Sequence, residues 1–258
     1  MQSSRSTRPL GFTLVELLIV VATLGILAAL LLPVLSKAKA RAQRTHCSSN
    51  LRQLLIAWNA YFQDNNGRLA ETYQTNNPYA WVQGNMKIAA EAENYDPIRK
   101  GTLFPFSRDV GIYHCPTDSG VDGEKPVFHT RSYSINCFMG ARDGDLPPIP
   151  STATGYVPFF AKDSDLKHPS ELWVMIDEDE HSIDDGFFIV DPSGQKWCDA
   201  PANSANRHVN TFALAFADGH CATWRNRDFG ASEITTSHDS SAGSLLLQRL
   251  AAASTVPK

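Results

Sequence analysis

The stretch Gly11-Phe-Thr-Leu-Val-Glu16 opens the long apolar run of this chain. From Leu14 to Leu32 the residues are apolar except for Glu16 and Thr23. At about 1.5 Å per residue, a helix of this length spans roughly the apolar core of a bilayer. A carboxylate in such a segment is costly to place in lipid, so it usually has a partner and a function. The stretch therefore predicts a membrane-spanning helix whose one acid has a specific role.

The junction between Gly11 and Phe12, followed by Glu16, resembles the N-terminal signal of type IV prepilins and type II secretion pseudopilins. In that family a short basic leader ends in Gly, and a prepilin peptidase cuts before Phe and methylates the new amine. The resemblance implies that Glu16 neutralises the N-terminal amine of a neighbouring subunit in a filament. It also implies a helix bend at Pro33, because proline removes a backbone donor. The predicted leader is residues 1–11.

Two other kinds of segment deserve comparison with this signal. A secretory signal peptide has an apolar core of about 7–15 residues, shorter than this run, and Glu16 fits poorly in it. A plain membrane anchor fits the length but leaves Glu16 and the Gly11–Phe12 junction without a role. Basic residues also follow the run, which under the positive-inside rule favours a cytoplasmic head. The leader motif outweighs this count and predicts a single pass through the inner membrane, with a cytoplasmic N-terminus and a periplasmic head.

The helix is expected to continue beyond the membrane, so that its full range is 12–66. Apolar residues recur there at the i, i+3, i+4, i+7 spacing of an amphipathic helix. They are Leu51, Leu54, Leu55, Trp58, Tyr61 and Phe62. Asn65-Asn66-Gly67 predicts its end, with Gly67 or an Asn in the left-handed conformation. The polar residues around Ser48 are the weak point of the predicted helix.

The remaining residues, 67–258, are expected to form one globular head with its own core. Short strand-like runs are predicted at 131–138, 172–176, 187–190, 211–217 and 220–225, and a short helix near Leu245. Asp218-Gly219 between the last two strands predicts a hairpin. Phe212, Leu214 and Phe216 should then face the core, against the amphipathic helix. The predicted fold class is α+β and pilin-like, with the long helix packed on an antiparallel sheet.

Charge and cysteine content limit the possible partners and compartment. Residues 1–52 carry seven Lys and Arg against Glu16 alone, whereas the rest of the chain is acidic. An acidic head argues against nucleic acid, which needs clustered positive charge. The five cysteines lack a Cys-x-x-Cys pair, so disulfides in an oxidising compartment explain them better than a zinc ribbon. Fifteen ways of drawing two bridges remain open, and the favoured one pairs Cys47 with Cys115.

Two further patterns concern possible sites. Nine residues separate His208 from Asp218-Gly219, a spacing that resembles a His-x9-Asp-Gly signature of prepilin-like families from planctomycete- and verrucomicrobia-type bacteria. An extended strand between them would hold the two ends about 30 Å apart, so an architectural role is expected rather than a shared metal. The acidic run 177–186 offers oxygen ligands for calcium, which loops in major pseudopilins bind. The candidate ligands are Asp177, Glu178, Asp179 and Asp184.

No nucleophile, P-loop or metalloprotease motif is present, so the sequence predicts no enzyme. The predicted function is a structural subunit of a type II secretion or type IV pilus-like filament. Its expected partners are prepilin peptidase, other pseudopilin subunits and the inner membrane. The alternative is an extracytoplasmic binding module for glycans or secreted cargo, carried on a prepilin-type anchor. A glycan platform would use Tyr79, Trp81, Trp173, Trp197 and Trp224, although buried aromatics are the commoner explanation.

Overall fold

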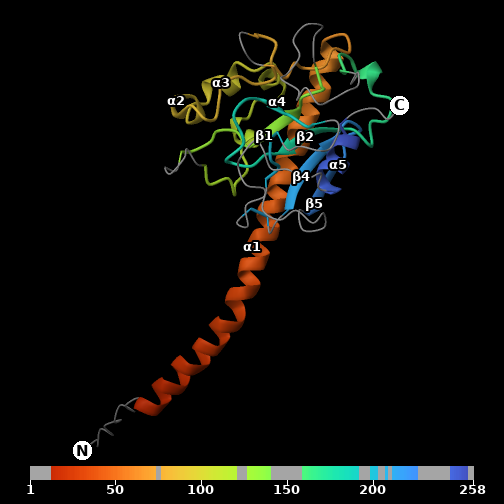
Figure 1. The fold of residues 1–258 in the computed structure, drawn as a ribbon. Helices are drawn as coiled ribbons and strands as arrows, with labels where there is room; N and C mark the ends of the chain where they lie inside the picture. Colours follow the sequence, from red (N-terminus) through yellow and green to blue (C-terminus); the bar gives the residue numbers. More distant parts are fainter. Residues whose placement is uncertain are drawn as a thin grey trace, which may run out of the picture. The chain divides into compact units, whose positions relative to one another are not determined.

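The computed structural model describes residues 13–73, 77–120, 127–140, 159–191, 198–202, 207–208, 211–225 and 245–254 (Figure 1). The chain forms two compact units, residues 1–42 and residues 43–258. The boundary between them falls within the first helix. Gly11, Phe12, Trp197 and most of the long loop after Gly140 lie outside the described residues.

Helix α1 runs from Leu14 to Asp64, as the apolar and amphipathic patterns predict for these residues. It continues through Pro33 and through the polar stretch around Ser48. It ends where expected, because Asn66 and Gly67 both have positive φ, at 56° and 77°. The amide of Gly67 donates to the Phe62 carbonyl at 2.8 Å, which satisfies an acceptor of the last turn.

Short helices follow α1 before the first strand. They are α2 (Ala89–Ala92), α3 (Asp96–Arg99), α4 (Phe104–Ser107) and the 3₁₀ turn η1 (Val110–Tyr113). A second 3₁₀ turn, η2 (Asp163–Asp165), lies between the first two strands. Gly101 sits where a side chain would not fit, since a Cβ there would lie 2.2 Å from the Trp81 carbonyl oxygen. This close approach packs the short helices tightly against the core.

The head contains one five-stranded sheet of order β3-β1-β2-β4-β5. Its strands are β1 (Tyr133–Asn136), β2 (Trp173–Asp177), β3 (Phe187–Phe188), β4 (Thr211–Phe216) and β5 (Cys221–Arg225). All five runs lie within or next to predicted strands, and β2 is a fully buried central strand, as its continuous apolar run indicates. The expectation of a wholly antiparallel sheet was wrong for one pair, since β3 lies parallel to β1. After β2 the chain forms β3 on the far side of β1, and then β4 on the side of β2 that faces away from β1.

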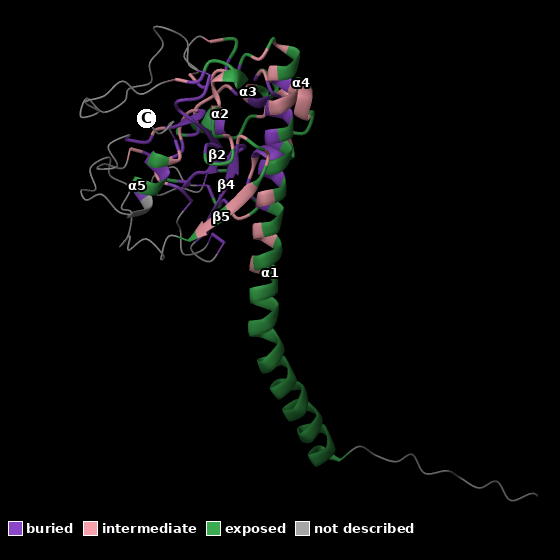
Figure 2. Ribbon diagram, turned by 90° about the vertical axis from the view of Figure 1, so that its right-hand side faces the viewer, coloured by how far each residue is buried: buried purple, intermediate pink, exposed green. Residues whose placement is uncertain are grey.

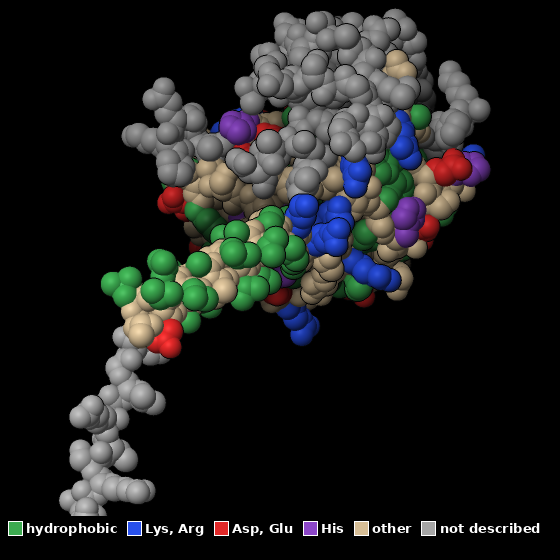
Figure 3. All heavy atoms as spheres, turned by 90° about the horizontal axis from the view of Figure 1, so that it is seen from below, with side chains coloured by type: hydrophobic (Ala, Val, Ile, Leu, Met, Phe, Trp, Pro, Cys, Tyr) green, Lys and Arg blue, Asp and Glu red, His purple; other side chains and the backbone are tan. Residues whose placement is uncertain are grey.

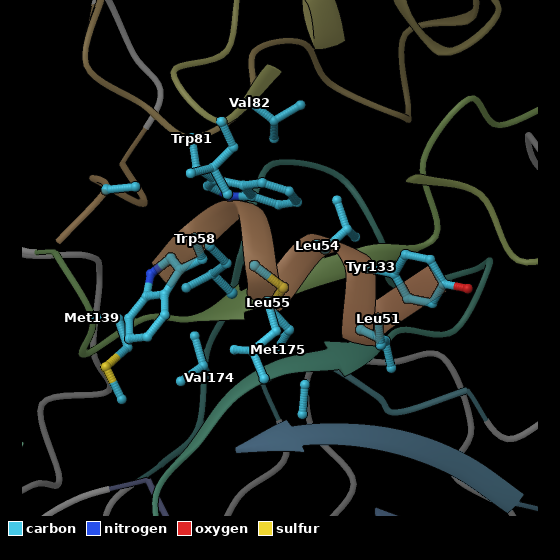
Figure 4. Close-up of a cluster of buried hydrophobic side chains, with 14 of the residues drawn as sticks. Leu51, Leu54, Leu55, Trp58, Trp81, Val82, Tyr133, Met139, Val174 and Met175 are labelled. Atoms are coloured by element: carbon cyan, nitrogen blue, oxygen red, sulfur yellow. The ribbon is translucent and has the colours of Figure 1, made fainter. Parts of the chain in front are cut away.

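The sheet separates two hydrophobic clusters. The helix-side core packs α1 residues from Cys47 to Tyr61 against the short helices and one face of the sheet (Figure 4). The tail-side core packs the other face against α5 (Leu245–Ala252), the helix expected near Leu245. Figure 2 shows the central strands buried, whereas residues 13–39 are exposed.

The hairpin of β4 and β5 forms with Asp218 and Gly219 at its turn, as predicted. The direction of its large side chains was predicted wrongly. Phe212, Leu214 and Phe216 belong to the tail-side core with α5, and the alanines at 213 and 215 belong to the helix-side core with α1. Small side chains leave room for the large side chains of α1 in the helix-side core, whereas the large side chains of β4 fill the tail-side core with α5.

Candidate functional site

The candidate assembly site lies in the first turn of α1. The carboxylate of Glu16 accepts hydrogen bonds from the Thr13 amide at 2.9 Å and the Thr13 hydroxyl at 2.7 Å. An acid at this position is also favoured by the positive end of the helix dipole. Gly11 and Phe12, the predicted processing residues, lie just before the described part of the helix.

The following residues of α1 present an apolar surface. Side chains from Leu14 to Leu35 are exposed, and Figure 3 shows hydrophobic side chains along this segment. By length and composition the helix is able to cross a membrane, although a signal sequence passes the same test. Pro33 lies within it, and its carbonyl accepts a hydrogen bond from the Ser36 hydroxyl at 3.0 Å.

A disulfide joins Cys47 of α1 to Cys115, which confirms the favoured pairing. Their Cα atoms are 5.4 Å apart, within the ordinary range for such a bridge. A hydrogen bond from the Asn50 side chain to the His114 carbonyl, at 2.9 Å, supports the same junction. The second part of α1 is therefore tied covalently to the segment that follows η1.

The two ends of the His-x9-Asp-Gly spacing have different surroundings. His208 is buried beside the disulfide, with Nε2 3.0 Å from Cys115 Sγ and 3.2 Å from Thr117 Oγ1. Asp218 and Gly219 form the β4–β5 turn, where the Asp218 carboxylate accepts from the His220 amide at 3.1 Å. In the part of the chain that the structure describes, both ends therefore make polar contacts with other residues of the head.

The four candidate calcium ligands each have a different protein partner. Asp177 pairs with Arg207 at 2.6 Å, and Asp184 pairs with Lys87 at 3.3 Å. Glu178 accepts hydrogen bonds from the hydroxyls of Ser134 and Ser182, and Asp179 lies 2.9 Å from His181 Nδ1.

Calcium needs six to eight oxygens directed at one point. The four acids are instead paired with protein groups on four different segments. This donor set therefore fits a single calcium ion poorly. A different trio, Asp179, Glu180 and His181, has ligand atoms within 4.8 Å of one another, but Glu180 also pairs with Arg207 at 2.9 Å. Calcium binding remains a prediction and enters no step of the function below.

The sequence reading missed the buried cation that organises this region. Arg207 is fully buried and donates to Asp177, to Glu180 and, at 2.8 Å, to the Glu178 carbonyl. Burial alone would lower the pKa of Arg207, but the charges of Asp177, Asp118 and Glu180 outweigh it and raise the pKa above its usual value. The acidic run 177–186 was the available signal in the sequence, because acids that are buried in a head require a cation nearby.

A second group of acids contains the buried Glu178 and Asp199 and the half-buried Asp185, and the buried guanidinium of Arg131 interacts with Glu178 and Asp185. Burial raises the pKa of Asp185 to about 7 and that of Asp199 to about 8, and the nearby Asp184 charge adds to both shifts. Burial likewise raises the pKa of Glu178 well above its ordinary value. The fold around these carboxyls therefore favours their neutral form over the ionised one, compared with carboxyls in solution.

A long N-terminal helix with an apolar first part, joined to an α+β head, is the architecture of a pilin-like protein. The chain is 33% identical over 130 residues to the type IV wide pilus major component PilA4 of Thermus thermophilus, which covers 45% of this chain and 93% of that protein. It is 44% identical over 54 residues to the type IV major pilin protein PilA of Myxococcus xanthus, covering 21% of this chain but only 24% of that protein.

The chain therefore belongs to the type IV pilin family. It spans about a quarter of the Myxococcus protein and nearly all of the Thermus one. No protein-family model matches the chain, and no solved structure matches it significantly.

Proposed function

We propose that this protein is a structural subunit of a type IV pilus-like or type II secretion-like filament. Membership of the pilin family supports this role, since both named relatives are major pilus components. The subunit is expected to work with other copies or related subunits, and its head is expected to lie outside the cytoplasm. Its relatives are structural proteins, which is indirect support for a role without catalysis.

The observation that carries the proposal is the single acid in the first turn of an exposed apolar helix. Leaving Glu16 uncompensated in an apolar environment costs several kcal/mol by general estimates. Its bonds to Thr13 satisfy part of that carboxylate within one subunit. A positively charged amine from a neighbouring subunit would supply the missing charge and would set the axial register of the filament.

The proposal includes cleavage between Gly11 and Phe12 by a prepilin peptidase and methylation of the new amine. Removal of residues 1–11 would place that amine four residues before Glu16 in each subunit. Residues 12–66 would then form the assembly helix and residues 67–258 the surface of the filament. Until extrusion, the apolar part of the helix would anchor the subunit in the inner membrane.

Intact-mass measurement and N-terminal sequencing of the protein from its native membrane test the processing step. A chain that starts at N-methylated Phe12 is expected. A chain that starts beyond the apolar run would indicate ordinary secretion and would contradict the proposal. A chain that retains its leader would contradict the cleavage step.

Assembly is tested separately with Glu16→Ala. The variant is expected to insert into the membrane normally but to be absent from sheared filaments, because it cannot pair with a neighbour's amine. Thr23→Val is the matched control, since Thr23 is an exposed polar residue of the same helix that bonds only within its own turn. Normal incorporation of Glu16→Ala into filaments would refute the assigned role of Glu16.

The alternative of a glycan-binding head gains no support from its proposed aromatic platform. Trp81 and Trp173 are fully buried, and the Trp81 indole donates to the Gly186 carbonyl at 2.6 Å. Tyr79 is half exposed. Trp224 is half-buried and packs against Phe212 and Arg249. Packing explains these three described tryptophans, so the filament subunit is the function we retain.

A further inference from the structure

Four side chains of the kinds that bind zinc meet in the interior of the head. They are Cys47, Cys115, Asp177 and His208, all buried, with one ligand atom of each within 4.8 Å of the others. They come from α1, from the segment after η1, from the end of β2 and from the segment before β4. Distant parts of the sequence are thus brought to one point by the fold.

The spacing of the ligand atoms is close to that of a tetrahedral zinc site. Zn–S bonds of about 2.3 Å and Zn–N or Zn–O bonds of about 2.0–2.2 Å place neighbouring ligand atoms roughly 3.3–3.8 Å apart. His208 Nε2 is 3.4 Å from Asp177 Oδ2 and 3.0 Å from Cys115 Sγ. When the disulfide is open, small rotations of the two cysteine side chains suffice to complete the set.

One oxygen of Asp177 is an independent indication of a missing ligand. Asp177 Oδ1 is held by Arg207 Nη2 at 2.6 Å, whereas the buried Oδ2 has no hydrogen-bond partner among the described residues. Buried carboxylate oxygens normally accept hydrogen bonds, so one that accepts none, with His208 Nε2 at 3.4 Å and the two sulfurs within 4.8 Å, requires an explanation. Arg207 would orient this carboxylate from behind, as outer-shell partners do in metal sites.

We propose that reduction of the Cys47–Cys115 disulfide converts this cluster into a site for one zinc ion. A dithiol reductant transfers two electrons and two protons to the disulfide and is itself oxidised to a disulfide. Zn²⁺ then displaces the two thiol protons, which pass to solvent, and binds both sulfurs. His208 binds through Nε2 with its ring proton on Nδ1, and Asp177 binds through Oδ2.

The charges of the site suit the ion. Two thiolates and Asp177 bring three negative charges, zinc brings two positive ones, and Arg207, which also pairs with Glu180, adds a positive charge beside the site. The same two sulfurs would therefore connect α1 to the rest of the head in both redox states, by a covalent bond when oxidised and through the metal when reduced. This inference goes beyond the filament role and does not depend on it.

The test uses the full chain in detergent micelles, reduced with a dithiol that is removed under nitrogen before metal is added. Cobalt(II) is expected to bind with one ion per chain and to give the thiolate charge-transfer and tetrahedral d–d bands. One equivalent of Zn²⁺ should abolish these bands, and the oxidised chain should not produce them. A reduced chain that gives no such spectrum would overturn the proposal.

Variants identify the ligands. Cys47→Ser is expected to abolish the cobalt spectrum, and His208→Ala to weaken zinc binding at least about ten-fold. His220→Ala is the matched control, because that ring pairs with Asp218 at the hairpin turn. Replacing Cys137, Cys198 and Cys221 together with serine should preserve the spectrum. The proposal fails if Cys47→Ser retains the spectrum.

X-ray absorption of the zinc-loaded wild-type chain provides a measurement that needs no variant. Two sulfur and two nitrogen or oxygen neighbours are expected. Three or four sulfur neighbours would show that other thiols bind the metal, and no sulfur neighbour would show an unrelated site. Either result would overturn the assignment even if every variant failed to fold.

Discussion

At the scale of single residues, the head depends on buried charges that are paired inside it. Arg207 has no exposed surface and reaches Asp177 at 2.6 Å and Glu180 at 2.9 Å. Such pairs gain little over an apolar replacement of both partners, but the loss of one partner leaves the other charge buried and alone. The part of the acidic run that contains Asp177 and Glu180 therefore depends on the guanidinium group of Arg207 for its stability.

Replacing the guanidinium group of Arg207 should lower the stability of the head strongly. Arg207→Met keeps much of the side-chain volume but leaves two buried carboxylates without their cation, so the expected loss is about 3–5 kcal/mol of unfolding free energy. Arg99→Ala is the control, because its pair with Asp96 is exposed and worth at most about 1 kcal/mol. Denaturant titration of the full chain in detergent, followed by tryptophan fluorescence, measures both. Equal stabilities of the two variants would contradict the structural role of Arg207.

At the scale of elements, strand β4 separates two layers by alternating side-chain size. Its alanines at 213 and 215 face α1, and its larger side chains face α5. Alternation of this kind is visible in the sequence, but it shows only that the two faces differ. Which helix takes which face depends on how closely each backbone approaches, and a single sequence does not contain that distance.

Enlarging a small residue on the α1 face should force the helix and sheet apart. Ala215→Leu is expected to lower the unfolding free energy by about 1–3 kcal/mol, because the core there is already filled. Thr223→Leu is the control, since Thr223 is exposed on the neighbouring strand β5 and its replacement should change stability by about 0.5 kcal/mol or less. Thermal unfolding of both variants measures the difference, and an unchanged melting temperature for Ala215→Leu would refute the tight packing around Ala215.

At the scale of the whole molecule, the sequence predicted what local pattern determines. The range of α1, the buried strand β2 and the Asp218-Gly219 hairpin follow from periodicity and turn chemistry, whereas the Cys47–Cys115 bridge was the favoured pairing among several that the sequence left open. The parallel pairing of β3 and the partner of each acid did not follow, because they depend on contacts between residues far apart in sequence. The same limit hid the meeting of His208 with the disulfide.

Buried acids also give the whole head a pH dependence whose sign can be worked out. Burial raises the pKa of Asp185 to about 7 and of Asp199 to about 8, whereas both carboxyls ionise near pH 4 in the unfolded chain. Between these values the folded state binds more protons, so stability rises as pH falls. Burial lowers the pKa of His114 and His129, which opposes this trend increasingly as pH falls toward and below the unfolded value of about 6.5.

Between pH 8 and 6.5 the titration of these two carboxyls outweighs that of the two histidines. Stability of the full chain should increase by roughly 1–3 kcal/mol as pH is lowered across this range, from the sum of two partial protonations. Asp199→Asn keeps the shape of the side chain but cannot titrate, so it should flatten much of this slope. Asp96→Asn, at an exposed position, should leave the slope unchanged. Denaturant titrations at intervals between pH 8 and 6.5 measure this slope. A wild-type stability that falls as pH is lowered from 8 to 6.5 would show that these acids are charged in the folded head.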